Sequence, residues 1–268
     1  MRTKIKALLC LVLCLALIAG STVSAQAAKT PLVLAHRGYC KKQIENTSQA
    51  MLSAYNHKFD GVEMDVWEGK NGTLWIFHDP TLDHMTGKSG RTVDLTLQNY
   101  KFYPYKNGQQ IQYLGDMLKQ LQGKQNIYLH LKGNGTSRFM TKSGQDKLVR
   151  IIKRNHLENE VVVFASENKM QKLNLPGIKK GWTTTLSEKY AQRAFIKRAR
   201  KAGVGHVILI SMSQFDKPEN RKRMSIYCHN RKIKLGIYSC KNREQYKKLR
   251  KYEVDFVMSD VKLKKKQM

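Results

Sequence analysis

The stretch "PLVLAHRGYC" (31–40) decides the fold, because a short apolar run passes directly into a His-Arg pair and a glycine. Proline opens the run and glycine closes it, a pattern typical of a short, fully buried strand. His36 and Arg37 are therefore expected at the carboxyl end of this strand. Both side chains bind anionic oxygens well, so the groups that meet them at that end should define the site.

The pattern of apolar strand followed by helix repeats along the chain. The helix after the first strand can be capped by Asn46 or Thr47. Eight strands alternating with helices predict an α/β fold, a single (β/α)8 barrel of the TIM type. A doubly wound open sheet is the alternative, but no glycine-rich phosphate loop follows any strand. The strands expected after the first cover 61–67, 127–132, 160–165, 179–184, 206–211, 234–239 and 255–259.

One segment interrupts this alternation. "TLWIFH" (73–78) follows the second strand after a turn at Asn71-Gly72, which predicts a hairpin. We expect this hairpin to be an excursion over the mouth of the barrel. Residues 80–115, which are polar and rich in Gly, Thr and Asn, then predict a long loop of the kind that forms lids or binding surfaces.

The beginning of the chain is a candidate targeting segment. Three basic residues precede an apolar stretch over 7–19, and small residues before position 28 offer cleavage sites. These features predict a secretory signal peptide over 1–27, followed by one barrel domain over 28–268. An uncleaved membrane anchor is the rival interpretation, although the apolar run is shorter than the ~20 residues of a spanning helix. We therefore expect a secreted or cell-surface protein.

The chain is strongly basic, with 49 Lys and Arg against 20 Asp and Glu and a formal net charge of +29. Such a field attracts polyanions. Specific nucleic-acid binding is not expected, because the basic runs lack interleaved aromatic residues and no nucleic-acid-binding motif is found. For an exported protein, an anionic cell wall or membrane surface is the expected partner. Charge that serves only solubility is the alternative.

Three cysteines remain after the signal, namely Cys40, Cys228 and Cys240. An odd number leaves at least one free thiol, and the spacing does not match a zinc site. Cys40 and Cys240 share a barrel face if both follow strands, so a disulfide between them stays open. The alternative is three free thiols.

Charged side chains gather where the expected strands end, which is where a TIM-type barrel places its reactive groups. Glu63 and Asp65 are two apart on the second strand, and His130 and Lys132 are two apart on the third, so each pair shares a face. Two carboxylates in an apolar strand repel each other unless a cation or a proton lies between them. Their oxygen ligands predict one divalent cation, Mg²⁺ or Ca²⁺. Salt bridges to this basic chain are the alternative.

The cationic and imidazole side chains complete a phosphate chemistry. Arg37 and Lys132 could hold the remaining oxygens of a substrate phosphate. His36 and His78, whose ordinary pKa lies near neutrality, could give and take protons on opposite sides of phosphorus. Each histidine alone is more often a structural hydrogen-bonding group, but together they predict cleavage of a phosphodiester.

The residues around these groups resemble the glycerophosphodiester phosphodiesterase family, a branch of the phospholipase C-like phosphodiesterase barrels. The resemblance is strong over residues 32–100 and thin afterwards. It implies a TIM-type barrel that hydrolyses glycerophosphodiesters to glycerol 3-phosphate and an alcohol with one Ca²⁺ or Mg²⁺. The matching stretches are "AHRG" (35–38), "ENT" (45–47), "DGVEMDV" (60–66), "NGTLWIFHD" (71–79), "LDHMTGKSGRTVDLT" (82–96) and "VDFVMSD" (254–260).

The resemblance implies a role for each site residue, with two departures from the family's pattern. The Glu-x-Lys of the third strand reads "HLK" here, so His130 takes the place of a metal-binding carboxylate while Lys132 keeps its phosphate role. Imidazole suits Mn²⁺ better than hard Ca²⁺ or Mg²⁺. Late in the chain, Tyr238 replaces an aromatic wall and Cys240 is expected to enter the mouth. The family's other roles fall on the acid/base pair His36 and His78, the phosphate-binding Arg37, the metal ligands Glu63 and Asp65, and the supporting carboxylate Glu45.

We therefore expect an exported metal-dependent phosphodiesterase that acts on deacylated phospholipids or on glycerol-phosphate wall polymers. His130 motivates an alternative, a catalytically impaired barrel that binds anionic phosphate polymers at the cell wall. A related lyase that leaves a cyclic phosphate is a third hypothesis.

Overall fold

The computed structural model describes residues 30–124, 126–133, 139–185, 189–210 and 218–263. The predicted signal peptide lies outside the described residues. Among the residues that are described, no helix is both long enough and apolar enough to cross a membrane.

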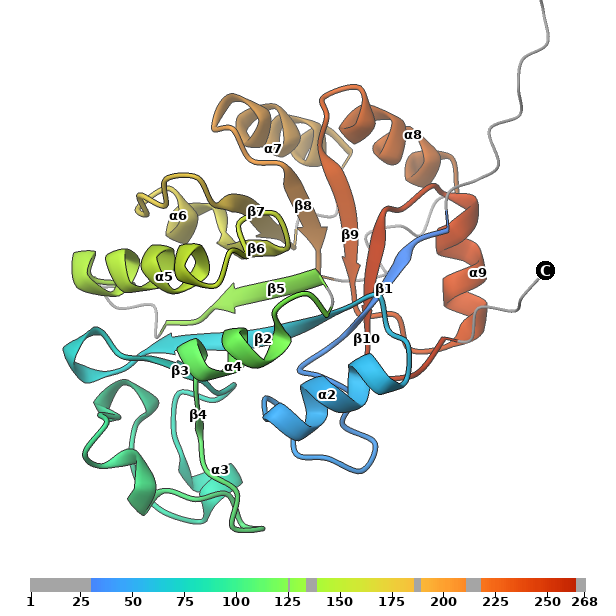
Figure 1. Ribbon diagram of the computed structural model, residues 1–268. Helices are drawn as coiled ribbons and strands as arrows, with labels where there is room; N and C mark the ends of the chain where they lie inside the picture. Colours follow the sequence, from blue (N-terminus) through green and yellow to red (C-terminus); the bar gives the residue numbers. More distant parts are fainter. Residues whose placement is uncertain (1–29, 125, 134–138, 186–188, 211–217, 264–268) are drawn as a thin grey trace, which may run out of the picture.

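Eight parallel strands close into a barrel (Figure 1). Each barrel strand pairs with the next, and β1 pairs with both β10 and β2, which closes the ring. The (β/α)8 fold predicted from the alternation of strands and helices is therefore confirmed. The barrel strands are β1 (Leu32–Ala35), β2 (Gly61–Glu68), β5 (Asn126–Leu131), β6 (Val161–Ser166), β7 (Lys179–Thr184), β8 (His206–Leu209), β9 (Lys234–Tyr238) and β10 (Phe256–Ser259).

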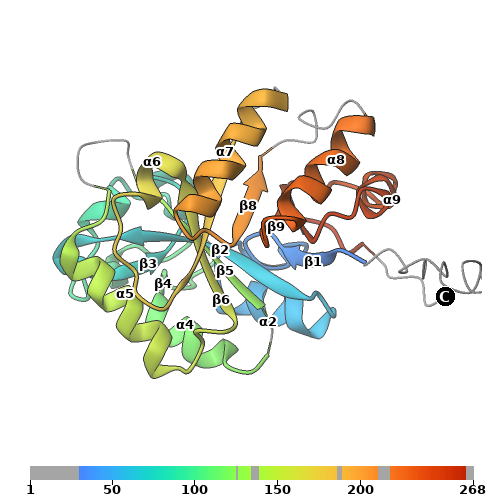
Figure 2. The ribbon, with the colours of Figure 1, turned by 90° about the horizontal axis from the view of Figure 1, so that it is seen from above.

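Helices surround the strands on the outside of the barrel (Figure 2). The first begins at Ser48 because the Thr47 side chain accepts a hydrogen bond from the Ala50 N–H. Of the two caps predicted, Thr47 is confirmed, and Asn46 has a different role described below. The helices are α2 (Ser48–Asn56), α4 (Leu114–Leu121), α5 (Lys142–Arg154), α6 (Glu167–Met170), α7 (Lys189–Lys201), α8 (Pro218–His229) and α9 (Arg243–Lys251).

Two apolar cores lie on opposite faces of the barrel strands. The larger core packs strands against helices and takes Val62, Met64 and Val66 from β2. Because successive side chains of a strand alternate, Glu63 and Asp65 face the barrel interior. The smaller core fills that interior with Leu34, Tyr128, Val162, Phe164, Ile208, Phe256 and Met258.

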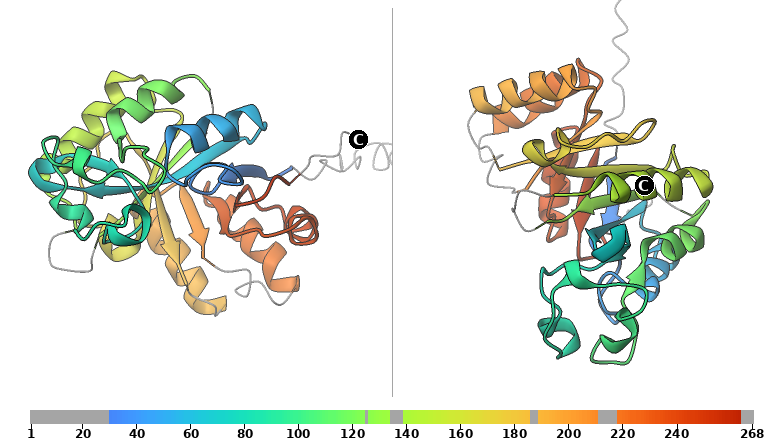
Figure 3. Two further views of the ribbon diagram at one scale, coloured as in Figure 1. Left: turned by 90° about the horizontal axis from the view of Figure 1, so that it is seen from below. Right: turned by 90° about the vertical axis from the view of Figure 1, so that its left-hand side faces the viewer.

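The excursion after β2 is a folded lobe beside the barrel (Figure 3). Its first strand, β3 (Leu74–Ile76), pairs antiparallel with β2, so the predicted hairpin is confirmed. The long loop predicted for residues 80–115 is more ordered than expected, because its scattered aromatic residues bury one another in a core of their own. The lobe contains η1 (Lys70–Gly72), α3 (Asp83–Thr86), η2 (Thr92–Asp94), η3 (Tyr100–Phe102) and β4 (Gln112–Tyr113).

Candidate active site

Three ligand-bearing side chains converge inside the mouth of the barrel. Glu63 and Asp65 are each only 1% exposed, and the register of β2 and β5 places His130 directly beside Asp65. His130 Nδ1 lies 3.4 Å from Asp65 Oδ1 and 3.9 Å from Glu63 Oε1. One donor atom from each of the three lies within 4.8 Å of the others, a spacing that fits a single metal ion. The structure thus brings together the three predicted metal ligands.

The two carboxylates have opposite electrostatic environments. Burial and the charge of Asp65 raise the pKa of Glu63 well above its usual range. Burial would also raise the pKa of Asp65, but His130 and Lys132 outweigh it and lower that pKa. The pair therefore has a deficit of positive charge next to Glu63. A divalent cation would remove the deficit, so the donor set fits a metal: oxygen ligands suit Ca²⁺ or Mg²⁺, and the imidazole suits Mn²⁺.

Asn46 orients one of these carboxylates. Its side-chain amide donates to Asp65 Oδ2 at 3.0 Å, and its side-chain oxygen accepts from the Asp65 backbone N–H at 3.1 Å. Asn46 has a φ of 58°, a left-handed conformation that asparagine tolerates better than most residues. Sequence reasoning considered Asn46 only as a helix cap. Its position in "ENT", directly before the capping Thr47, was the available signal.

His36 is backed by a carboxylate from the last barrel strand. Its Nδ1 lies 2.6 Å from Asp260 Oδ1, and its Nε2 lies 2.7 Å from the Tyr238 hydroxyl. A proton on Nδ1 shared with Asp260 leaves Nε2 as the proton acceptor. Burial lowers the pKa of His36, but the hydrogen bond to Asp260 and the charge of Glu63 outweigh it, so the net pKa is raised. Asp260 was missed as a site residue, although it directly follows the last predicted strand.

Arg37 is held between the buried carboxylates of β2 and Glu45. Its Nη1 donates to both oxygens of Glu45 at 2.9 Å, and its Nε lies 3.4 Å from Asp65 Oδ2. Its backbone N–H also donates to Glu63 Oε2 at 3.1 Å. From β5, Lys132 Nζ lies 3.5 Å from Asp65 Oδ1. Both predicted phosphate-binding cations therefore lie beside Asp65, and the predicted supporting Glu45 reaches the site through Arg37.

His78 reaches the same mouth from the excursion. Its Nδ1 lies 2.6 Å from Asp79 Oδ1, which repeats the carboxylate-backed arrangement of His36. The charge of His78 is close enough to contribute to the lowered pKa of Asp65. Trp67 donates its indole N–H to the His78 carbonyl oxygen at 3.2 Å. Sequence reasoning missed this contact, although Trp67 is two positions beyond Asp65 on the same face of β2.

A cavity of about 760 Å³ opens at His36 and Arg37 and is also lined by Cys40, Lys41 and Lys262. Cys240 does not enter it, contrary to the prediction. The Cys240 side chain is fully buried in the core between the strands and the helices, because its small apolar thiol packs on that side of the chain after β9. Cys40, Cys228 and Cys240 are all free thiols, so the disulfide left open between Cys40 and Cys240 is absent.

The chain is similar in sequence to a known protein family and to several of its members. The sequence model of the Glycerophosphoryl diester phosphodiesterase family matches residues 36–263. A glycerophosphodiester phosphodiesterase of Caldanaerobacter subterraneus subsp. tengcongensis is 43% identical over 70 residues, which cover 26% of this chain and 29% of that relative. Glycerophosphodiester phosphodiesterase 1 of Rattus norvegicus is 37% identical over 68 residues, 25% of this chain and 20% of that relative. The chain thus matches less than a third of the length of these two curated relatives.

Solved structures share the fold over most of the chain. A glycerophosphodiester phosphodiesterase of Thermotoga maritima has a TM-score of 0.72 at 21% identity, covering 87% of this chain and 95% of that one. An Oleispira antarctica phosphodiesterase, solved in complex with the product sn-glycerol-3-phosphate, has a TM-score of 0.70 at 21% identity, covering 86% and 93%. At such identities the likeness shows the fold alone. Because the family model spans most of its length, the chain belongs to the glycerophosphoryl diester phosphodiesterase family.

Proposed function

We propose that this chain is an exported, metal-dependent phosphodiesterase that hydrolyses glycerophosphodiesters to glycerol 3-phosphate and an alcohol. The observation that carries the proposal is the convergence, at one barrel mouth, of two buried carboxylates, two cations and two histidines that each have a carboxylate at Nδ1. Family membership supports the reaction class.

Arg37 and Lys132 bind the substrate phosphate in this proposal. Both cations already lie within 3.5 Å of Asp65, so they can shift part of their hydrogen bonding to phosphate oxygens without moving far. The contact of Nη1 with both Glu45 oxygens, together with Nε beside Asp65, keeps the guanidinium of Arg37 in one orientation. A planar guanidinium held in this way is preorganised for a tetrahedral anion, which reduces the ordering cost of binding.

His36 and His78 exchange the protons that the reaction moves. Hydrolysis breaks one P–O ester bond, removes a proton from the attacking oxygen and delivers a proton to the departing oxygen. Asp260 and Asp79 hold the Nδ1 atoms of the two histidines, so each Nε2 is the atom that faces the substrate in this proposal; that of His36 lies 3.1 Å from Arg37 Nε until substrate takes its place. Tyr238 contacts the Nε2 of His36 and supports its orientation.

Glu63, Asp65 and His130 would hold the divalent cation of the proposal. Their carboxylate oxygens suit Ca²⁺ or Mg²⁺, and the imidazole suits Mn²⁺. When bound, such an ion polarises a phosphate oxygen and neutralises charge that develops on it. Asn46 keeps Asp65 in a fixed orientation through two hydrogen bonds. A bound cation would also stabilise the ionised form of Glu63 over its protonated form.

Export and attachment to an anionic surface complete the proposal. The basic and apolar pattern of residues 1–27 supports a signal peptide, and an uncleaved anchor would keep the barrel at the membrane surface. The formal charge of +29 supports retention at a polyanionic cell wall or membrane. Such a location concentrates the enzyme at phosphodiesters of glycerol.

The test is turnover by the purified chain, incubated with glycerophosphocholine and with a polyglycerol phosphate in Ca²⁺, Mg²⁺ or Mn²⁺. We expect glycerol 3-phosphate to be released and chelation to abolish its release. Phosphorus NMR of the products separates hydrolysis from a lyase that stops at a cyclic phosphate. Retained polymer binding without turnover in any metal would instead favour a catalytically impaired, polymer-binding barrel.

A further inference from the structure

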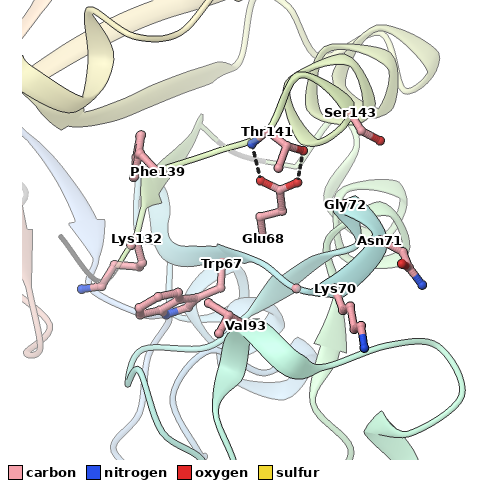
Figure 4. A pocket seen from close by; sticks show the side chains of 12 residues that line it. Trp67, Glu68, Lys70, Asn71, Gly72, Val93, Lys132, Phe139, Thr141 and Ser143 are labelled. Atoms are coloured by element: carbon pink, nitrogen blue, oxygen red, sulfur yellow. Dashed lines mark hydrogen bonds between the residues drawn. The ribbon is translucent and has the colours of Figure 1, made fainter. Parts of the chain in front are cut away.

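A second hollow, of about 410 Å³, meets the catalytic centre at Lys132 (Figure 4). Its lining includes Trp67, Glu68, Lys70, Val93, Lys132 and Phe139, and we call it the side pocket. The Lys132 ammonium faces Asp65 at 3.5 Å, so a phosphate bound by Lys132 has one ester arm beside the side pocket. The volume holds roughly a dozen waters, which is enough for an alcohol of glycerol size or larger.

One wall of the side pocket is rigid and apolar. Trp67 is 3% exposed and is fixed by its hydrogen bond to the His78 carbonyl. Val93 of the excursion lies beside Trp67, and Phe139 adds an aromatic ring to the lining on the other side of Lys132 (Figure 4). A carbon chain such as a polyol backbone can pack against this wall, but the wall is uncharged and does not discriminate between cationic and anionic ligands.

The charge around the side pocket is positive. Lys70 lines it directly. Lys169 Nζ lies 5.0 Å from the centroid of the Phe139 ring and donates to the Gly133 carbonyl at 3.2 Å. Burial and the neighbouring charge of Lys132 lower the pKa of Lys169. Within the described part of the chain, neither Lys70 nor Lys169 has a carboxylate oxygen within 4 Å, although Lys70 is close enough to Asp94 to help lower the pKa of that carboxyl.

Glu68 is the carboxylate that lines the side pocket, and its side chain is directed away from the space that a ligand would fill. Glu68 Oε2 accepts from the Thr141 backbone N–H at 2.6 Å, and Glu68 Oε1 accepts from the Thr141 hydroxyl. Figure 4 shows Glu68 pointing toward Thr141 and away from Trp67. A quaternary ammonium ligand binds best against an aromatic ring. The Phe139 ring is already in contact with the Lys169 ammonium, so it is not free to bind such a ligand.

We propose that the side pocket receives the alcohol arm of the diester, and that Lys70 and Lys169 select an alcohol carrying a further phosphate over a cationic alcohol such as choline. This inference rests on the proposed phosphodiesterase function and narrows its substrate class to chains of glycerol and phosphate. Like-charge repulsion disfavours the cationic arm, and a second phosphate supplies the anion that the two lysines lack. The bond that is cleaved stays the same.

The experiment compares two substrates on the metal-loaded chain. They are glycerophosphocholine and a synthetic glycerol-phosphate trimer, assayed for kcat/KM, with the Kd of each measured by calorimetry on the catalytically slowed Asp260→Asn variant. The double variant Lys70→Gln/Lys169→Gln is the test. The matched control is Lys124→Gln plus Lys119→Gln, which removes the same charge at exposed positions away from the pocket.

We expect the wild type to prefer the trimer, and the pocket variant to reduce the trimer-to-choline ratio of kcat/KM about 10-fold, since each exposed charge contributes on the order of 1 kcal/mol or less. The control should keep the wild-type ratio. Equal ratios in the pocket variant and the control would overturn the inference. If neither substrate is cleaved but the Kd preference for the trimer is lost in the pocket variant, the inference stands and the proposed reaction fails.

Discussion

The two ends of the barrel each bury a histidine, and the two histidines have opposite electrostatics. At the carboxyl end, carboxylates of Asp260 and Glu63 overcome burial and raise the pKa of His36. At the amino end, His206 begins β8 and packs against the rings of Tyr128 and Phe256. There burial, aided by nearby lysines, lowers the pKa of His206 to about 4.

The difference lies in the partners rather than in the depth of burial. His36 is 8% exposed and His206 is 6% exposed, yet only His36 has a carboxylate at hydrogen-bond distance from Nδ1, whereas His206 Nδ1 has no hydrogen-bond partner among the described residues. A buried imidazole without a carboxylate stays neutral and inert. One with a carboxylate can exchange a proton near neutral pH. The comparison therefore links the proposed proton exchange of His36 to the carboxylates of Asp260 and Glu63 beside it.

The largest effect should come from removing a carboxylate at the functional end. Asp65→Asn deletes the charge that Arg37, Lys132 and His130 face, and an amide is a weaker ligand for a divalent cation. We expect kcat/KM to fall on the order of 100-fold or more, together with weaker Mn²⁺ binding in calorimetry. Asp116→Asn, an exposed carboxylate on α4, is the control. Unchanged metal affinity in Asp65→Asn would remove the metal site from the proposal.

The next effect belongs to the opposite end and concerns stability. The folded pKa of His206 is about 4 and the unfolded value about 6.5, so protonation favours the unfolded chain. The free energy of unfolding should be unaffected by His206 above pH 6.5 and should fall by up to about 3 kcal/mol as the pH drops toward 4.

The variant His206→Phe tests this linkage by urea unfolding at several pH values. We expect a shallower loss of stability than in the wild type between pH 6.5 and 4. His57→Gln, at an exposed histidine, should keep the wild-type slope. Parallel curves for the wild type and His206→Phe would show that His206 is not the titrating group.

The barrel was predictable because each strand carries its own signal. Short apolar runs bounded by Pro, Gly or charged residues mark buried parallel strands regardless of what they contact. The rest of the folded lobe was not predictable in the same way, since Leu82, Leu95 and Tyr105 are spread through a polar sequence and join one core only after the chain turns back. Local periodicity indicates which residues of one element are buried, but it does not predict a core made from several loops.

The site residues also differ in whether the sequence could predict their contacts. Glu63 with Asp65 could be placed together because a spacing of two fixes one face of a strand. Asp260 pairs with His36 across 224 positions, a contact that exists only because β10 closes the barrel against β1. Asn46 likewise reaches Asp65 from a loop on the neighbouring strand. Such partners follow from closure of the barrel, which the sequence indicates as a fold but not as individual side-chain contacts.

The smallest effect should separate a tryptophan that serves the site from one that only packs. Trp67→Phe keeps a ring in place but deletes the N–H that holds the His78 carbonyl, so His78 is less firmly positioned while the phosphate-binding cations are untouched. Loss of one hydrogen bond of about 1 kcal/mol predicts roughly a fivefold fall in kcat. Trp182→Phe, in the outer core against Phe195, should lower the unfolding temperature and leave kcat alone. Equal kcat in the two variants would assign Trp67 a packing role only.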